Sequence, residues 1–272
     1  MTILITGGTG KTGSRVAQAL TDRGHPIRVA TRHSAPPFDW NDQTTWDDVL
    51  QGCSAAYVTF QPDLALPGAD EIIAVFARTA VAHGCRRLVL LSGRGEEGAR
   101  RSELALTESG ADWTVLRSAF FMQNFTESFF ADEIAHGSLT MVEHSVGEPF
   151  IDAGDIADVA VSALLDRSHI GRVYELTGPR LLTFGQVARE ISSVTGRDVA
   201  YQGLPVDAYV DVLVAAGFPE EDAWGLAYLF DEVLDGRNAH VDDGVRSVLG
   251  REPRDFSGFL ASALSVAGDT RG

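Results

Sequence analysis

Three glycines spaced three residues apart, Gly7, Gly10 and Gly13, follow the short apolar run Ile3–Ile5 near the start of the chain. A glycine cluster between a strand and a helix lets the backbone approach a phosphate closely. The helix N-terminus then attracts negative charge through its N–H groups and its dipole. The pattern therefore predicts a strand that turns directly into a helix, with a phosphate-bearing cofactor at the turn.

Two kinds of phosphate-binding loop compete for this segment. The run Gly10-Lys11-Thr12 imitates the end of a nucleoside-triphosphate loop, but that motif needs a glycine at the position of Ile5. The spacing leaves the looser form of the dinucleotide fingerprint, whose glycines serve the turn, the approach to pyrophosphate and helix packing. The loop residues that we expect to bind the cofactor are Gly7, Thr9, Gly10, Lys11, Thr12 and Gly13.

The end of the second expected strand indicates which dinucleotide is bound. That strand covers residues 27–31 and is followed by Arg32. An acidic residue at this position holds the ribose 2′-hydroxyl of NAD, whereas arginine pairs with the 2′-phosphate of NADP. Arg32 therefore predicts NADP(H), with a solvated surface arginine as the alternative.

Apolar runs of strand length alternate with helical segments further along the chain. We expect strands at residues 55–60, 87–92, 113–117 and 172–177, with helices between them. This alternation predicts an α/β fold with a doubly wound parallel sheet, in which ligands bind beyond the carboxyl ends of the strands.

Length and composition limit the remaining possibilities. With 272 residues and 44% hydrophobic content, the chain can bury a full core, and its net charge of −16 disfavours direct nucleic-acid binding. There is no apolar run of membrane-spanning length, so we expect a cytoplasmic protein without a membrane segment, as a monomer or homodimer. Cys53 and Cys85 are expected to be buried free thiols, and no metal site is expected.

Several segments stand together in the order found in one known family. They are Gly7–Gly10, Leu90–Ser92, Ser109–Arg117, Phe120–Phe125, Phe150–Ala160, Tyr174–Pro179 and Gly250–Arg254. In this combination the chain resembles the NmrA-like type of atypical short-chain dehydrogenase/reductase. The resemblance implies a Rossmann domain that binds NADP(H) and a smaller region that closes over the nicotinamide. We place the dinucleotide-binding domain at 1–155, with its sheet completed by about 172–178, and a mainly helical substrate region at 180–272.

The resemblance also implies roles for individual residues. Asp39 and Trp40, at the end of a third strand, would lie near the adenine, with a turn cap and local packing as the respective alternatives. Ser92 and Phe120 would approach the nicotinamide. The residues that would border the ribose are Thr59, Phe60 and Gln61.

The aromatic side chains that follow strand 113–117 and fill the C-terminal third suit a pocket for a flat, apolar small molecule. Plain packing of the small lobe is the alternative. The residues that we assign to substrate binding are Phe121, Asn124, Tyr209 and Trp224.

Proton chemistry is where the chain departs from the wider superfamily, whose reductases place a tyrosine four residues before a lysine. Lys11 is the only lysine, so this pair cannot exist here. Ser92, a bound water or a substrate hydroxyl would then orient the substrate oxygen, and the alternative for Ser92 is a strand-end hydroxyl that bonds the cofactor or the backbone. The charged residues after it, from Arg94 to Glu103, are expected on a solvated loop and helix face.

These observations favour an NADPH-dependent reductase that transfers hydride to a ketone or quinone of an apolar, aromatic, polyketide-like small molecule. Hydride transfer would then rest on positioning rather than on a protein acid. The alternative is a non-catalytic NADP-binding redox sensor that acts through a protein partner. A third hypothesis is an epimerase or isomerase that uses the nicotinamide transiently.

Overall fold

The computed structural model describes residues 2–269 and their side chains as far as residue 263. The described chain forms two compact units. Unit 1 comprises residues 2–118, 153–176 and 242–252, and unit 2 comprises residues 119–152, 177–241 and 253–269. The boundaries expected from sequence, 1–155 and 180–272, differ from these because the chain passes between the units repeatedly.

Unit 1 is built on a six-stranded sheet in the order β2-β1-β3-β4-β5-β7, and every neighbouring pair of strands is parallel. In that order the strands are Ile27–Ala30, Thr2–Thr6, Cys53–Val58, Arg87–Gly93, Asp112–Ser118 and Arg172–Leu176. The central strands are buried on both faces, as parallel strands covered by helices require.

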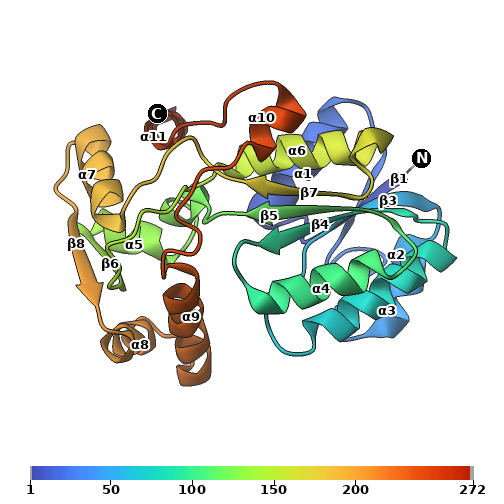
Figure 1. Ribbon diagram of the computed structural model, residues 1–272, viewed down its shortest axis with the longest axis horizontal. Coiled ribbons are helices and arrows are strands. Elements are labelled where there is room, and N and C mark those ends of the chain that lie inside the picture. Colours follow the sequence, from blue (N-terminus) through green and yellow to red (C-terminus); the bar gives the residue numbers. More distant parts are fainter. Residues whose placement is uncertain (1, 270–272) are drawn as a thin grey trace. The chain divides into compact units, whose positions relative to one another are not determined.

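Helices cover both faces of this sheet (Figure 1). One layer contains α1 (Lys11–Asp22), α6 (Ala153–Leu165) and α10 (Gly244–Leu249), and α1 and α10 both pack on α6. The other layer contains α2 (Trp46–Leu50), α3 (Ala69–Ala82) and α4 (Glu97–Thr107). The predicted doubly wound parallel sheet is therefore confirmed.

One predicted strand is wrong. Residues 38–40 do not end a third strand, because the next strand after β2 is β3, at Cys53–Val58. The segment begins with Pro36 and Pro37, which lack the N–H groups that a ladder needs. It forms only an isolated bridge between Asp39 and Asp42, followed by the short 3-10 turn Gln43–Thr45.

Unit 2 combines helices with a two-stranded parallel sheet of β6 (Ser138–Val142) and β8 (Ala200–Leu204). Its helices are α5 (Phe129–Ala135), α7 (Phe184–Thr195), α8 (Val206–Ala215), α9 (Glu220–Val233) and α11 (Phe256–Asp269). Its core is rich in phenylalanine, and the rings of Phe125, Phe150 and Phe184 contact one another.

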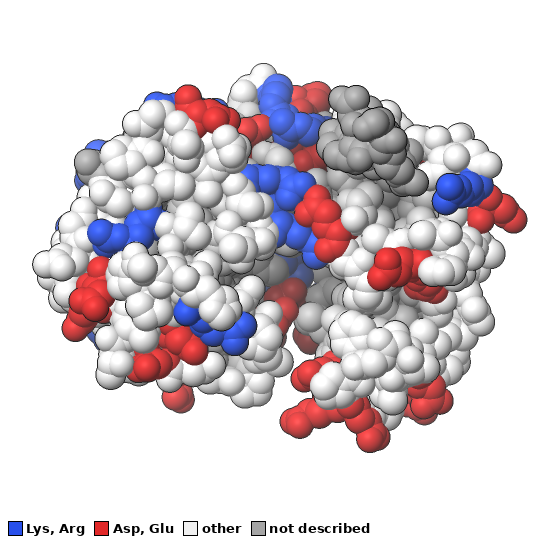
Figure 2. Space-filling model, turned by 180° about the vertical axis from the view of Figure 1, so that it is seen from behind, with Lys and Arg blue, Asp and Glu red and all other residues white. Residues whose placement is uncertain are grey.

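The surface, the helices and the two cysteines bear on the expectations about charge, membrane segments and thiols. Acidic side chains recur over the face drawn in Figure 2, with basic ones interspersed. No helix within residues 2–269 has both the length and the apolar character needed to cross a bilayer. Cys53 and Cys85 are buried free thiols, as expected.

A glycine contact explains why β1 and α1 pack so closely. A Cβ atom on Gly13 would lie 2.3 Å from the carbonyl oxygen of Gly7. Backbone cannot retreat from such an overlap as a flexible side chain can, so Gly13→Ala strains the turn. Gly225, on the exposed face of α9, offers a contrast, because a Cβ atom there would meet nothing within 4 Å.

We expect Gly13→Ala to lower the free energy of unfolding by about 1–3 kcal/mol, because the added methyl group overpacks the turn. The matched variant Gly225→Ala should raise it by up to about 1 kcal/mol through helix propensity. Urea unfolding followed by circular dichroism measures both. Equal effects of the two variants would contradict the packing argument.

Candidate functional site

A cavity of about 570 Å³ opens in unit 1 beyond the carboxyl ends of β1 and β2. The strand order reverses beside β1, and such switch points are where open α/β sheets bind ligands. The cavity is lined by Gly7, Thr9, Ala30, Thr31, Arg32, His33, Phe38, Asp39, Trp40, Asn41, Gln61 and Pro62. Residues from four separate parts of the predicted cofactor set thus line one cavity.

The floor of the glycine turn is formed by contacts that exclude side chains. Gly7 has a φ of +60°, in the left-handed region, and a Cβ atom there would lie 2.2 Å from the Thr59 hydroxyl oxygen. That hydroxyl donates to the Thr6 carbonyl at 3.1 Å, and the Thr59 N–H donates to the Thr6 hydroxyl at 2.8 Å. Thr59 therefore joins the ends of β3 and β1, and its hydroxyl packs against Gly7 of the turn.

The first turn of α1 presents main-chain donors. Gly10 is its N-cap residue and supplies no side-chain oxygen to cap the helix. The first N–H groups of a helix lack intrahelical partners, so they attract an anion. Thr12, predicted to bind the cofactor, is buried beside Tyr57, and Gly13 is buried as well. These two residues face the protein, whereas Gly7 and Thr9 line the cavity.

Arg32 lies on the cavity wall and is exposed. Within residues 2–269 its guanidinium group has no hydrogen-bond or ion-pair partner. His33 follows it on the same wall, so the tip of β2 carries no acidic side chain. At the tip itself Arg32 thus offers a positive charge with no carboxylate beside it in sequence, while Asp39 lines another part of the same cavity.

Asp39 and Trp40 take the local roles considered for them, a turn cap and packing, and both also line the cavity. The Asp39 carboxylate accepts the Asn41 N–H at 2.9 Å and so caps its own turn, while the residue lines the cavity. The Trp40 ring is largely buried, and its centroid lies 5.2 Å from that of Phe60 and 4.9 Å from that of Phe76. Packing against Phe60 and Phe76 thus fixes the Trp40 part of the cavity wall.

Ser92, the predicted orienting group, is buried near the end of β4, and its hydroxyl donates to Glu103 Oε1 at 2.7 Å. Glu103 also accepts two-pronged hydrogen bonds from Arg117, with Nη2 to Oε2 at 2.6 Å. Because a hydroxyl has one proton to donate, Ser92 in this arrangement serves Glu103 rather than a substrate oxygen.

The ion pairs continue along the carboxyl edge of the sheet. Arg117 contacts Glu175 at 2.9 Å, Glu175 contacts Arg94 at 3.0 Å, and Arg94 contacts Asp242 at 2.6 Å. Hydrogen bonds to Glu103 and Glu175 raise the pKa of Arg117 above its ordinary value. We call these five charged residues the ion-pair chain.

The expectation of a solvated charged face after Ser92 is wrong for two residues. Arg94 is 3% exposed and Glu103 is 5% exposed, and both belong to the ion-pair chain. The partners of Arg94, Glu175 and Asp242, lie 81 and 148 residues away from it in sequence, and Glu103 is bonded to Ser92 and Arg117. The only signal in the sequence was for Arg94, which stands two residues after the expected strand 87–92, where ligands and buried polar groups gather in such sheets.

The predicted substrate residues all belong to unit 2 but have different surroundings. Tyr209 is buried in the phenylalanine core, and its hydroxyl has no hydrogen-bond partner within the described residues. Burial raises the pKa of this phenol. Trp224 is half-buried and stacks on Tyr228 along α9, with ring centroids 5.5 Å apart.

Phe121 and Asn124 lie in the segment that opens unit 2. Phe121 forms a parallel bridge with Ile151, and Asn124 belongs to the 3-10 turn Met122–Phe125. Phe120, predicted to approach the nicotinamide, packs its ring against Phe150 and Phe184. The roles of these residues toward a ligand stay predictions.

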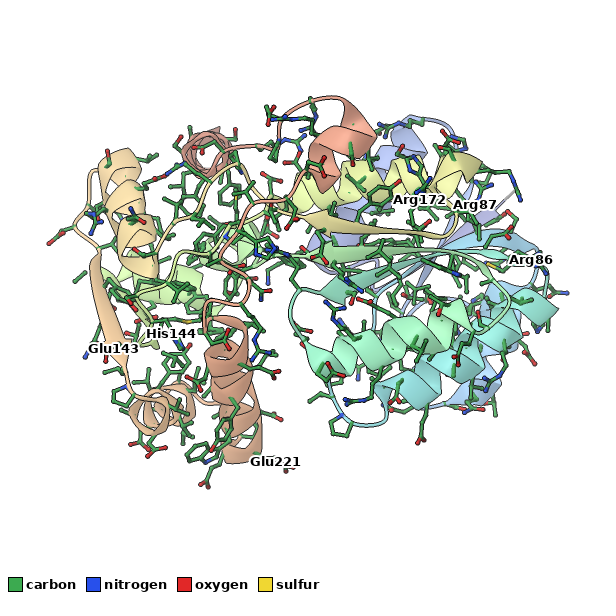
Figure 3. The ribbon with its side chains drawn as sticks, in the orientation of Figure 1. Arg86, Arg87, Glu143, His144, Arg172 and Glu221 are labelled. Atoms are coloured by element: carbon green, nitrogen blue, oxygen red, sulfur yellow. The ribbon has the colours of Figure 1, made fainter. Side chains whose placement is uncertain are left out.

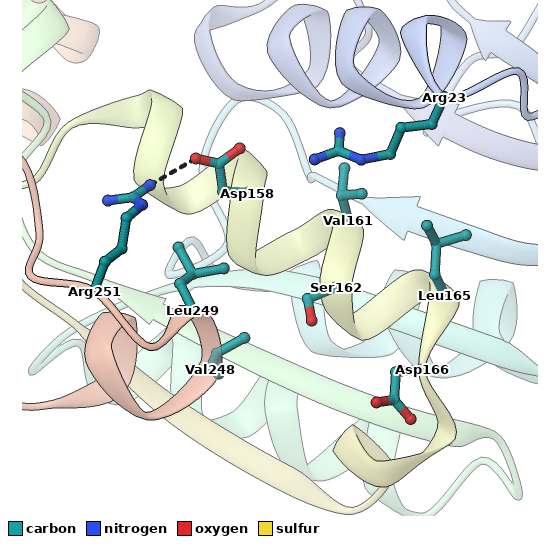
Figure 4. Close-up of a pocket in the computed structure, with 9 residues that line it drawn as sticks. All are labelled: Arg23, Asp158, Val161, Ser162, Leu165, Asp166, Val248, Leu249 and Arg251. Atoms are coloured by element: carbon teal, nitrogen blue, oxygen red, sulfur yellow. Dashed lines mark hydrogen bonds and ion pairs between the residues drawn. The ribbon is translucent and has the colours of Figure 1, made fainter.

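Unit 1 has two further regions with charged side chains. Arg86, Arg87 and Arg172 mark the opposite edge of the sheet, where β4 and β7 begin (Figure 3), and buried Arg87 donates to the Leu164 carbonyl at 2.6 Å. A second cavity of about 500 Å³ lies beside α6 (Figure 4). None of the predicted site residues is among the nine that line it.

A parallel sheet of this order, with a glycine-rich turn at its switch point, defines unit 1 as a doubly wound domain of the Rossmann type. The model of the NmrA-like family matches residues 103–260, which is more than half of the chain. The chain therefore belongs to the NmrA-like family, and the resemblance drawn from sequence is confirmed.

Individual proteins are similar over nearly the whole chain. An uncharacterized oxidoreductase of Bacillus subtilis is 31% identical, over 96% of this chain and 94% of that protein. Agroclavine dehydrogenase of Claviceps fusiformis is 32% identical, over 98% of each chain. The structure of an NADPH-dependent quinone oxidoreductase of Escherichia coli, complexed with NADPH, is similar with a TM-score of 0.80 at 21% identity, over 96% of this chain and 99% of that one.

We expect Ser92→Ala to lower the free energy of unfolding by about 1 kcal/mol, because Glu103 keeps both of its bonds to Arg117. Arg117→Met should cost about 3–5 kcal/mol, because it leaves the buried Glu103 carboxylate without its cation. Urea unfolding of both variants checks the ranking. A serine variant that costs as much as the arginine variant would show that the hydroxyl, not the ion pair, stabilises Glu103.

Proposed function

We propose that this protein is an NADP(H)-dependent reductase that transfers hydride to a ketone or quinone of an apolar, aromatic small molecule. The observation that carries the proposal is the position of Arg32, exposed and without a partner among the described residues, on the wall of the cavity that also contains Gly7. The names of the relatives, an oxidoreductase and a dehydrogenase, support the same class of activity.

The residues of the cavity fit such a cofactor. The Gly7 backbone and the uncapped N-terminus of α1 suit a pyrophosphate, since no Cβ atom or capping side chain stands in the way. Arg32 suits the 2′-phosphate, which guanidinium groups bind through paired charge-assisted hydrogen bonds. Asp39, Trp40, Phe60 and Gln61 would flank the adenosine. When bound, the nicotinamide supplies or accepts the hydride.

The chain's own contribution to the chemistry is positioning. No tyrosine stands four residues before a lysine, and the Ser92 proton is directed to Glu103. An acceptor that needs little protonation by the protein, such as a quinone, suits this arrangement, because correct placement alone supplies a large part of the rate advantage. The aromatic side chains of unit 2, Phe121, Tyr209 and Trp224 among them, would bind the flat substrate.

Arg32→Ala should weaken NADPH binding about 10- to 100-fold, because a charge-assisted contact to the 2′-phosphate contributes about 1.5–3 kcal/mol. Affinity for NADH, which lacks that phosphate, should change little. Fluorescence titration of both nucleotides measures the two dissociation constants. The control is Arg23→Ala, which removes an exposed arginine that lines the second cavity instead. Equal losses for both nucleotides would refute the assignment of Arg32.

The alternative is a redox sensor that binds NADP(H) without turnover, which the missing Tyr-Lys pair and the engaged Ser92 hydroxyl favour. Loss of NADPH absorbance with a panel of quinones and aromatic ketones separates the two functions. Turnover of any acceptor supports the reductase. Tight NADPH binding with no turnover and a co-purifying protein partner supports the sensor, while product formation without net NADPH loss indicates an isomerase.

A further inference from the structure

The places where the chain leaves and re-enters unit 1 share an unusual feature. The chain passes between the units five times, after residues 118, 152, 176, 241 and 252. Within three residues of each passage, on the unit 1 side, there is an arginine or a carboxylate engaged in an ion pair. These residues are Arg117, Asp155, Glu175, Asp242 and Arg251.

Arg94 connects three of these passages. Its Nε donates to Glu175 Oε2 at 3.0 Å, and its Nη2 donates to Asp242 Oδ2 at 2.6 Å. Its backbone N–H donates to the Ser118 carbonyl at 3.2 Å, at the last residue before the first passage. The side chain is 2% exposed, so water does not compete for these bonds.

The segment that returns to unit 1 at residues 242–252 packs closely against the end of β7. A Cβ atom on Gly244, two residues after Asp242, would lie 2.2 Å from the Glu175 carbonyl oxygen. The end of β7 and the start of α10 are thus in backbone contact beside the carboxylates that Arg94 bridges. The passages after residues 176 and 241 are thus held both by backbone packing and by the ion pairs of Arg94.

The two remaining passages have their own arginine. Arg251 contacts Asp155 and Asp158, each at 2.7 Å, and the contact with Asp158 is drawn in Figure 4. The Asp155 side chain is fully buried at the start of α6. Arg251, Asp155 and Asp158 share no residue with the ion-pair chain. These three residues and the ion-pair chain therefore lie at different passages.

We propose that Arg94 is a positioning residue for hydride transfer. It fixes the ends of three chain passages at the carboxyl edge of β4, β5 and β7, and Phe120, predicted to approach the nicotinamide, stands two residues beyond the first. The inference rests on the proposed function. Loss of Arg94 lets these ends move, and small misplacements of reacting groups reduce rates strongly. The cavity lined by Gly7 and Arg32 shares no residue with the ion-pair chain.

The test compares Arg94→Met with the matched variant Arg246→Met. Arg246 lies on the same returning segment but forms an exposed ion pair with Glu252, away from the buried chain. Arg94→Met should lower kcat about 10- to 100-fold and raise KM for the acceptor, with the dissociation constant of NADPH unchanged within about twofold. Arg246→Met should leave all three values unchanged. The three constants are measured for both variants well below the unfolding temperature of each variant.

Two further variants apply if Arg94→Met does not fold. Arg94→Lys keeps the charge but, as a point charge, cannot bridge both carboxylates in the arginine geometry, so its kcat should fall between those of the wild type and Arg94→Met. Asp242→Asn weakens one arm of the bridge and should act in the same direction. Rescue by lysine to full wild-type rates would show that charge alone suffices and would overturn the positioning role.

Amide hydrogen exchange tests the anchoring without turnover. In Arg94→Met, or in Arg94→Lys if only that variant folds, exchange at residues 93–95, 118–122 and 241–245 should quicken at least about tenfold, while exchange in α1 stays unchanged. Unchanged exchange there, or unchanged kcat and KM with only a lower Tm, overturns the proposal. A wild-type protein that binds no NADPH refutes the proposed function instead, and the exchange result still decides whether Arg94 anchors the passages.

Discussion

The backbone of Gly7 lies directly against Gly13 and the Thr59 hydroxyl, and much of unit 1 depends on this contact. It brings α1 onto β1 and joins the ends of β1 and β3, between which the strand order reverses. A side chain at either glycine would separate these elements. The same close approach leaves the turn without Cβ atoms, so one steric constraint both packs the sheet and shapes a surface for phosphate.

A second constraint operates at the carboxyl ends of β4, β5 and β7. Buried charges require partners, and the ion-pair chain satisfies Arg94 and Glu103 by bringing together the ends of β4, β5 and β7 with the segment before α10. Apolar packing of equal volume would stabilise the edge without choosing partners, whereas this arrangement pairs particular carboxylates with particular guanidinium groups. The arrangement therefore specifies where the chain leaves the sheet.

The sequence predicted best where the signal is local. Apolar runs placed β4 and β5 almost to the residue, because buried parallel strands are continuous apolar runs. The family resemblance placed residues 38–40 at the end of a strand, which is wrong. The charge pattern failed at Arg94, whose burial depends on partners 81 and 148 residues away, and at Glu103, which is paired with Ser92 and Arg117. The structure assigns residues 119–152 to unit 2 and residues 242–252 to unit 1, groupings that depend on contacts distant in sequence.

By itself, the sequence determined the glycine turn, the absence of a Tyr-Lys pair and the arginine at the tip of β2, because each depends on which residues stand at fixed offsets along the chain. Only the tertiary structure decided that Thr12 faces Tyr57 and that Ser92 gives its proton to Glu103. It also decided which carboxylates hold Arg94. The physical reason is range: steric and spacing constraints act within a few residues, whereas a buried charge or hydroxyl is satisfied by whichever group the fold carries to it.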